Sequence, residues 1–210
     1  MSLAIFSLPY FGPISFYAKL VKYDIIYIEA CENYQKQSHR SRQYIYGANG
    51  KLMLNIPVKH SKSSSRLKYK ESKIENEFKW QLLHFRSLEA AYRTSPYFEF
   101  YEADIEPLYT KKYEYLFDYN LECFKTIFRL LDLDLQFKLN SEYKSDYEQI
   151  EDNRHLVKAK KSISITQKPY HQVFEDKFGF IENLSILDLL FNLGPEGLSY
   201  LKSINEFQSL

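Results

Sequence analysis

The fold is decided by residues 3–28, which read LAIFSLPYFGPISFYAKLVKYDIIYI. Two apolar runs in this stretch, Leu3–Leu8 and Ile25–Ile28, are typical of buried strands. A turn follows the first run, and its last residue, Pro13, suits the first position of a helix. Residues 14–22 then place apolar side chains four residues apart, on one helical face. Strand, helix and strand in this order predict a parallel pair with a right-handed crossover.

A long polar loop, Glu29–Arg42, follows the second apolar run and reads EACENYQKQSHRSR. Loops at the carboxyl ends of strands are where α/β proteins usually place ligands. Lys36 and Arg42 are the best candidates for an anion site, because arginine binds phosphate or carboxylate at two points and lysine adds a point charge. The loop therefore predicts the binding site for an anionic substrate.

Other polar residues of this loop complete the prediction or compete with it. Asn33 and Glu29 are expected to contact the same substrate. The alternative is that Arg42 forms an ion pair with Glu29 or Glu32, which would fix the loop without binding a ligand.

A hairpin is predicted beyond the loop. Residues 43–46 and 52–58 form its arms, and Asn49-Gly50 supplies the positive φ angles of a tight turn. The apolar residues of the second arm alternate, so we expect one buried face, made of Leu52, Leu54, Ile56 and Val58.

The central and C-terminal parts are predicted to be mainly helical. One helix runs from a cap at Asn76 to about Tyr92 and another over residues 113–131. In the tail, Ser185 caps a helix that Gly194 ends. The apolar stripe expected on the first of these helices consists of Phe78, Leu82, Phe85, Glu89 and Tyr92.

The sequence thus predicts an α/β fold: a mixed sheet with an initial β-α-β unit, a hairpin, and a helical central and C-terminal part. We expect a single domain over residues 1–210, because 210 residues suit one core. The polar residues 138–160 lack periodicity and are expected to be weakly ordered. Residues 59–73 hold six basic and one acidic side chain, which indicates either an anion-binding loop or a solvated one.

Composition excludes several classes of protein. The 28 basic and 27 acidic side chains give a formal net charge of +1, so we expect no nucleic-acid partner. No stretch approaches the roughly 20 apolar residues of a membrane helix, and the first residues lack a signal-peptide pattern. Two cysteines, Cys31 and Cys123, are interpreted as reduced thiols. These features predict a cytoplasmic protein without a membrane span.

Two ionisable residues are candidates for catalysis. His84 could act as a general base, and the alternative is a structural histidine on a helix. Asp188 could be a catalytic carboxylate, but Ser185-x-x-Asp188 also fits a helix capping box. Gln172 and Asn183 could face a ligand from the same neighbourhood. The five histidines lack metal-binding spacing and no glycine-rich phosphate loop is present, so we predict no metal and no cofactor.

Four segments in this order carry a family likeness. The chain resembles the WbqC-like protein family, in its Bacteroidetes form. The segments are PYFGPISFYAKL from residue 9, YIEACENYQKQSHRSRQYIYGANGKLMLNIPV from residue 27, KWQLLHFRSLEAAYRTSPYFEFYEADI from residue 79, and YHQVFEDKFGFIENLSILDLLFNLGPEGL from residue 170.

The resemblance implies a function. The family is associated with O-antigen and other surface-polysaccharide gene clusters, so the resemblance implies a transferase of an aminoacyl, acyl or related group in that pathway. It also implies an anionic donor, either a sugar-nucleotide or an activated acyl or aminoacyl compound. The alternative is a non-catalytic accessory module that binds a glycan precursor or a protein. A site that unites Lys36, Arg42 and His84 would favour the enzyme.

Overall fold

The computed structural model describes residues 1–59, 67–159, 163–205 and 207–209. It confirms the predicted opening. Strand β1 (Leu3–Ser7), helix α1 (Ile14–Leu20) and strand β2 (Ile25–Glu29) follow one another, and the two strands pair in parallel along their whole length. Both strands are largely buried, as their apolar sequences require.

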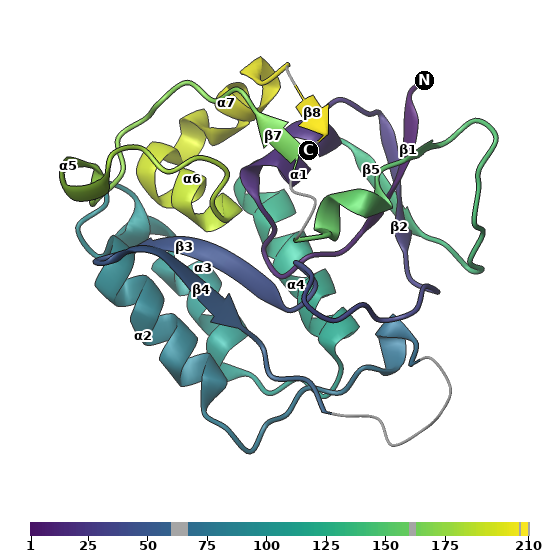
Figure 1. The fold of residues 1–210 in the computed structure, drawn as a ribbon, viewed down its shortest axis with the longest axis horizontal. Helices are drawn as coiled ribbons and strands as arrows, with labels where there is room; N and C mark the ends of the chain where they lie inside the picture. Colours follow the sequence, from purple (N-terminus) through teal and green to yellow (C-terminus); the bar gives the residue numbers. More distant parts are fainter. Residues whose placement is uncertain (60–66, 160–162, 206, 210) are drawn as a thin grey trace.

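The main sheet has four parallel strands in the order β5-β2-β1-β6. Strand β5 (Gln136–Leu139) pairs with β2, and the short β6 (Glu151–Asp152) pairs with β1. Neither strand is among the predicted elements. Residues 131–139 read LDLDLQFKL, an alternation that is a strand signal for β5 and was overlooked, whereas β6 has only two residues, both acidic, and carries no such signal. Since all four strands run the same way, their carboxyl ends meet at one edge of the sheet (Figure 1).

The predicted hairpin is present as a separate two-stranded sheet, β3 (Arg42–Gly47) and β4 (Gly50–Asn55). Its turn differs in detail from the prediction. Gly47 pairs with Gly50, so the two turn residues are 48 and 49, and Gly50 takes the positive φ of 93°. The expected buried face is also only partly right, because Leu52 is exposed whereas Leu54 is buried.

Helix α2 (Trp80–Tyr92) begins four residues later than the predicted cap. Asn76 does not cap it; its side chain donates to the carbonyl of Tyr113 and accepts from the indole of Trp80. The predicted apolar stripe is only partly right, since Tyr92 is buried but Phe78 and Leu82 are exposed. The buried face consists of Trp80, His84, Leu88, Ala91 and Tyr92.

Helix α4 (Leu116–Leu130) is the predicted central helix, and it lies between the main sheet and α2 (Figure 1). Phe124 packs on Tyr17 of α1 and edge-on against Phe137 of β5. On the other side, Tyr119 packs edge-on against Trp80 of α2. Helix α3 (Phe98–Thr110), which packs against α2 and α4, was not predicted as a helix.

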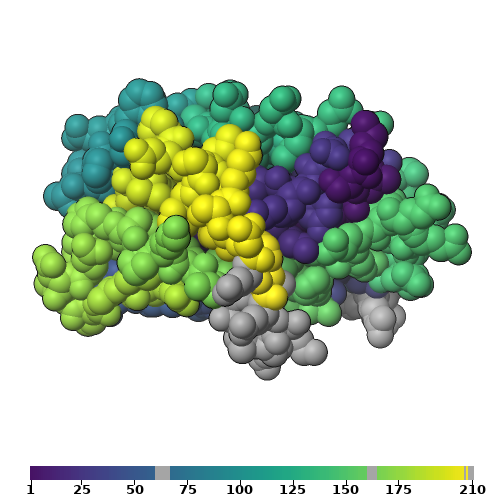
Figure 2. All heavy atoms as spheres, turned by 90° about the horizontal axis from the view of Figure 1, so that it is seen from above, coloured from purple at the N-terminus to yellow at the C-terminus, as the bar shows by residue number. Residues whose placement is uncertain are grey.

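The C-terminal part forms two short strands, three helices and a 3-10 turn. They are β7 (Ile163–Ile165), α5 (Glu175–Phe178), α6 (Ile186–Leu193), η3 (Gly194–Glu196), α7 (Gly197–Ser203) and β8 (Phe207–Ser209). Ser185 caps α6 as predicted. Seen from above, the last residues lie between the segment around residue 175 and the N-terminal strands (Figure 2). Within the described ranges, no helix has both the length and the apolarity of a membrane span.

Candidate functional site

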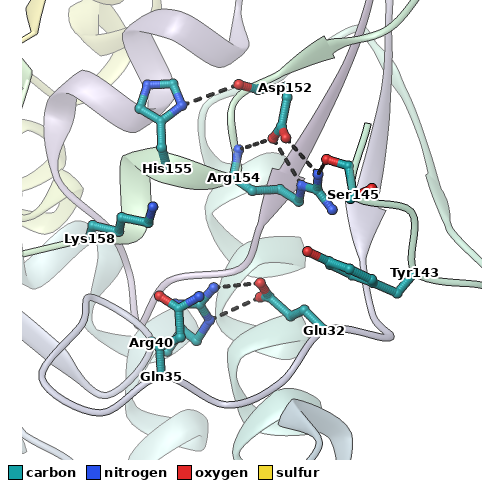
Figure 3. Close-up of a pocket in the computed structure, with 9 residues that line it drawn as sticks. All are labelled: Glu32, Gln35, Arg40, Tyr143, Ser145, Asp152, Arg154, His155 and Lys158. Carbon is teal, nitrogen blue, oxygen red and sulfur yellow. Dashed lines mark hydrogen bonds and ion pairs between the residues drawn. The ribbon is translucent and has the colours of Figure 1, made fainter. Parts of the chain in front are cut away.

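A cavity of about 270 Å³, which we call the crevice, opens at the carboxyl edge of the parallel sheet. Three segments line it: the loop after β2, the connection between β5 and β6, and the turn after β6, which includes η2 (Arg154–Val157). Figure 3 shows the lining residues, which are Glu32, Gln35, Arg40, Tyr143, Ser145, Asp152, Arg154, His155 and Lys158.

A buried ion pair forms one wall of the crevice. The guanidinium of Arg40 donates to both carboxylate oxygens of Glu32, at 2.9 and 2.6 Å, and the Arg40 side chain is 1% exposed. The same guanidinium donates to the hydroxyl of Ser7, the last residue of β1, at 3.3 Å. The pair therefore ties the loop after β2 to the neighbouring strand end and holds both charges in a fixed position.

A second arginine, Arg154, holds the opposite wall. Its five N–H groups donate to Asp152, Glu29 and the backbone carbonyls of Lys144 and Ser145. The ion pair with Asp152 is 2.6 Å long (Figure 3). Although burial opposes the effect, the hydrogen bonds from Arg154 lower the pKa of the Asp152 carboxyl. Arg154 therefore links the ends of β2 and β6 and holds the β5–β6 connection in place.

The loop after β2 is irregular, yet backbone hydrogen bonds hold it in place. The amide of His39 donates to Val157 at 2.8 Å, and the His39 carbonyl accepts from Tyr10 at 2.7 Å. The side-chain amide of Asn120 donates to the Arg40 carbonyl at 2.7 Å. Burial lowers the pKa of His39 to about 4, so this histidine is neutral near pH 7 and adds no positive charge to the loop.

Two basic side chains of the crevice remain available to a ligand. Lys158 is exposed and forms no ion pair with any other described residue, and its ammonium points into the crevice (Figure 3). His155 is also exposed, and its Nδ1 lies 3.2 Å from the Asp152 carbonyl. Because a carbonyl only accepts, Nδ1 carries the hydrogen, which leaves Nε2 of the neutral ring as an acceptor.

Sequence reasoning missed Lys158 and His155. They follow β6, a strand of only two residues, Glu151 and Asp152, which are both acidic. No apolar run therefore marks the strand whose carboxyl end positions them. The signal that could have found them is the run Asp152-Asn153-Arg154-His155, which places acidic and basic groups next to one another in a polar segment.

Two more hollows continue from the crevice along the same loop. The tyrosine hollow, of about 480 Å³, is lined by Glu32, Asn33, Tyr34, Gln35, Leu67 and Tyr143, three of which also line the crevice. The Lys36 hollow, of about 260 Å³, is lined by Tyr34, Lys36, Gln37, Ser41, Arg42, Asn55, Ile56 and Val58. Tyr34 is common to these two hollows.

The structure therefore brings Lys36 and Arg42 to one hollow and places Asn33 in the next. Arg42 does not form the ion pair considered for it, because Glu29 pairs with Arg154 and Glu32 pairs with Arg40. Its Nε instead lies 3.4 Å from the side-chain oxygen of Asn55. Glu29 is completely buried beneath the crevice.

His84 lines none of these three hollows. It is 6% exposed, and its Nδ1 lies 2.9 Å from the hydroxyl of Tyr10. The ring lies near the backbone of Asn55, a residue that lines the Lys36 hollow. Burial lowers the pKa of His84 to about 4, although the Asn55 backbone opposes this shift. The ring is thus neutral near pH 7 and enclosed by the core.

Asp188 and Gln172 lie together in the core, and neither lines any of the three hollows. The Asp188 carboxylate accepts hydrogen bonds from Tyr92, Tyr170 and Gln172, at 2.9, 2.5 and 2.9 Å. Burial raises the pKa of Asp188, although these three hydrogen bonds oppose the rise. The capping-box prediction is wrong, because the amide of Ser185 donates to Tyr44 and not to Asp188.

Asn183 lies at the start of α1. Its side-chain oxygen accepts from the amide of Ser15 at 2.9 Å, and its own backbone has a positive φ of 55°. The amide of Ile14 donates to the carbonyl of Leu184. The first amides of α1 are thus occupied by the segment before α6.

A family model described as the WbqC-like protein family matches residues 8–167. The chain belongs to this family. The matched range contains every residue of the crevice and of the two neighbouring hollows, as well as His84. Gln172, Asn183 and Asp188 lie outside the matched range. No curated protein and no solved structure matches the chain.

Other groups complete the description of this WbqC-like chain. In the part of the chain that the structure describes, no group of His, Cys, Asp and Glu side chains is arranged to hold a metal ion. Both cysteines are free thiols. Of the basic segment 59–73, residues 60–66 lie outside the described ranges. Within the rest of it, Lys59 and Lys73 pair with Glu75 and Glu114.

Proposed function

We propose that this WbqC-like protein is a transferase of O-antigen or surface-polysaccharide biosynthesis, and that the crevice binds the anionic part of its donor. The transferred group is aminoacyl, acyl or a related group. One observation carries the proposal: the crevice lies at the carboxyl edge of a parallel sheet, with Lys158 and His155 exposed between two walls fixed by buried arginines. The pathway comes from the family association.

The chemistry of the crevice suits group transfer. Both walls are held by ion pairs, so the site needs little rearrangement when a substrate binds. Lys158 would balance the charge of a phosphate or carboxylate on the donor. His155, through Nε2, would accept the proton of the attacking hydroxyl or amine, while the leaving group departs with the electron pair of the bond that breaks.

Lys36 and Arg42 remain predicted anion contacts in the neighbouring hollow. Their position beyond Tyr34 suits the far end of a long donor or an acidic acceptor. In this proposal they bind substrate and take no part in the proton transfer.

The test is turnover by the purified full chain with aminoacyl, acyl and sugar-nucleotide donors and a sugar acceptor. His155→Gln should lower the rate by about 100-fold or more, as expected for loss of a general base. Lys158→Ala should raise the KM for the donor. His171→Gln is the matched control, because His171 is an exposed histidine that lines none of the three hollows. Absence of turnover with every donor, or equal rates for His155→Gln and the control, would contradict the proposal.

The second candidate is a non-catalytic module that binds a glycan precursor or a partner protein in the same pathway. A specific observation favours it: all five N–H groups of Arg154 are already donated within the protein. Arg154 therefore has none left with which to stabilise a transition state. Binding of a precursor without turnover, at the same crevice, would support the module over the enzyme.

A further inference from the structure

The crevice and the tyrosine hollow form one connected site with two chambers. They share Glu32, Gln35 and Tyr143, and their volumes are about 270 and 480 Å³. Sites for small molecules usually span about 300–1,000 Å³. A single ligand can therefore extend from one chamber into the other and meet different chemistry in each.

The tyrosine hollow suits a flat ring. Two aromatic residues, Tyr34 and Tyr143, line it, and the Arg154 guanidinium lies over the Tyr143 ring, 5.1 Å from its centroid. The side-chain amides of Asn33 and Gln35 can both donate and accept hydrogen bonds. Among the described residues that line it, Glu32 is the charged one, and it is neutralised by Arg40. Amide groups beside aromatic faces are the usual means of holding a nucleobase, which stacks on the ring and bonds along its edge.

The crevice suits the phosphates. It contains the unpaired ammonium of Lys158, the imidazole of His155 and the hydroxyl of Tyr143, which points in from the side opposite Lys158 (Figure 3). The carboxylates that line it, Glu32 and Asp152, are both paired with arginines. A phosphate group therefore meets one free positive charge and no unpaired negative charge among the described lining residues.

The usual alternative place for a phosphate is closed. In dinucleotide-binding folds the pyrophosphate lies against the first helix after β1. Here the first two amides of α1, those of Ile14 and Ser15, donate to Leu184 and Asn183. These two amides are therefore not available to a phosphate, which favours the side chains of the crevice as its ligands.

We propose that the donor is a nucleoside diphosphate compound, with its base in the tyrosine hollow and its phosphates in the crevice beside Lys158. The role of this compound as a donor rests on the proposed function. Its binding does not require catalysis. A sugar ring fits the tyrosine hollow less well than a base. A sugar presents many hydroxyl donors, and Glu32, which supplies the carboxylate among the described lining residues, already accepts two bonds from Arg40.

Calorimetric titration of the full chain tests the assignment with uridine diphosphate, adenosine diphosphate, uridine, inorganic pyrophosphate and glucose 1-phosphate. A nucleoside diphosphate should bind at least about tenfold more tightly than pyrophosphate, uridine or the sugar phosphate, because only it fills both chambers.

Two variants separate the chambers. Tyr143→Leu, at a residue that is 53% exposed, should weaken uridine and nucleoside diphosphate by about tenfold and pyrophosphate by clearly less, because it removes the ring from the tyrosine hollow but only one hydroxyl from the crevice. Lys158→Ala should weaken the diphosphates and leave uridine unchanged. Lys125→Ala is the matched control, since Lys125 is an exposed lysine that pairs with Glu122 on α4.

Three outcomes would overturn the assignment: no binding of any probe, equal affinity for pyrophosphate and nucleoside diphosphate, or equal loss of all probes in Tyr143→Leu. Turnover with an acyl or aminoacyl donor that contains no nucleotide, together with any of these outcomes, would reject the nucleotide assignment and leave the transferase proposal standing. Nucleotide binding with no turnover would reject the transferase proposal and leave the nucleotide assignment standing.

Discussion

Arg40 and Glu32 form a two-point ion pair inside the protein, with hydrogen bonds of 2.9 and 2.6 Å. The two side chains are 1% and 6% exposed. Both belong to the loop after β2, and both line the crevice. The pair is therefore a structural element of the candidate site, and its loss should affect stability before it affects chemistry.

Glu32→Ala should lower the free energy of unfolding by about 3–5 kcal/mol, because the guanidinium of Arg40 is left buried without its partner. The double variant Glu32→Leu with Arg40→Met should recover much of this loss, since it removes both charges. Urea unfolding followed by circular dichroism measures both values. Glu114→Ala is the control: it breaks the exposed pair with Lys73 and should cost no more than about 1 kcal/mol. Equal costs for the buried and the exposed pair would contradict the account of the crevice wall.

His84 should make the protein sensitive to mild acid. Its pKa falls from 6.5 in the unfolded chain to about 4 in the folded protein. Below pH 6.5 the unfolded chain binds a proton at His84 that the folded protein does not bind. The contribution of neutral His84 to stability is therefore fully present above pH 6.5 and is lost as the pH falls to 4. The loss is about 3 kcal/mol.

In His84→Gln this contribution should be absent. The difference in unfolding free energy between the wild type and His84→Gln should shift against the wild type by about 3 kcal/mol between pH 7.5 and 4. His39 titrates over the same window, but it is present in both proteins and cancels. Urea unfolding at five pH values measures the shift. A constant difference across this range would show that His84 is not held neutral.

Asp188 should give a pH dependence of stability opposite to that of His84. Burial raises its pKa above the ordinary 3.8, so the folded protein keeps this proton to higher pH than the unfolded chain does. The stabilisation is present at low pH and is lost as the pH rises from about 4 through the raised pKa. Asp188→Asn should therefore lose less stability relative to the wild type at pH 7 than at pH 4, as measured by thermal unfolding of both proteins at the two pH values. A penalty that grows with pH would mean that the carboxylate is stabilised in its charged form.

Arg154→Lys should loosen the connection between β5 and β6. Lysine has three donors on one nitrogen and cannot reproduce the five bonds to Asp152, Glu29 and the two backbone carbonyls. Amides of residues 142–148 should exchange with solvent at least about tenfold faster, while those of β1 and β2 stay protected. Mass spectrometry of peptides resolves the two regions. Unchanged exchange in residues 142–148 would contradict the role assigned to Arg154.

The first half of the fold could be predicted because its pattern is strong. Apolar runs, Pro13 and a glycine at the hairpin turn are local signals, and they locate β1, α1, β2 and the hairpin. The polar loop after β2 is also predicted to carry a binding site, because its position follows from the strand that precedes it, and this loop lines the crevice and both neighbouring hollows.

The other half of the site could not be predicted, for a physical reason. Strand β6 lies at one edge of the sheet and consists of two acidic residues, so it carries no apolar pattern, whereas the alternation that marks β5, LDLDLQFKL over residues 131–139, is present in the sequence and was overlooked. Without β6, nothing indicates that Arg154 and Lys158 reach the crevice. His84 and Asp188 illustrate the converse: both have reactive groups, but tertiary packing encloses them, and burial cannot be inferred from a single side chain.

The central claim is that the anionic donor binds in the crevice beside Lys158. A crystal structure of the protein soaked with uridine diphosphate tests it most directly. The account predicts density for the phosphates within hydrogen-bond distance of Lys158 and for the base between Tyr143 and Asn33. Density confined to the hollow of Lys36 and Arg42, or no density at this edge of the sheet, would contradict it.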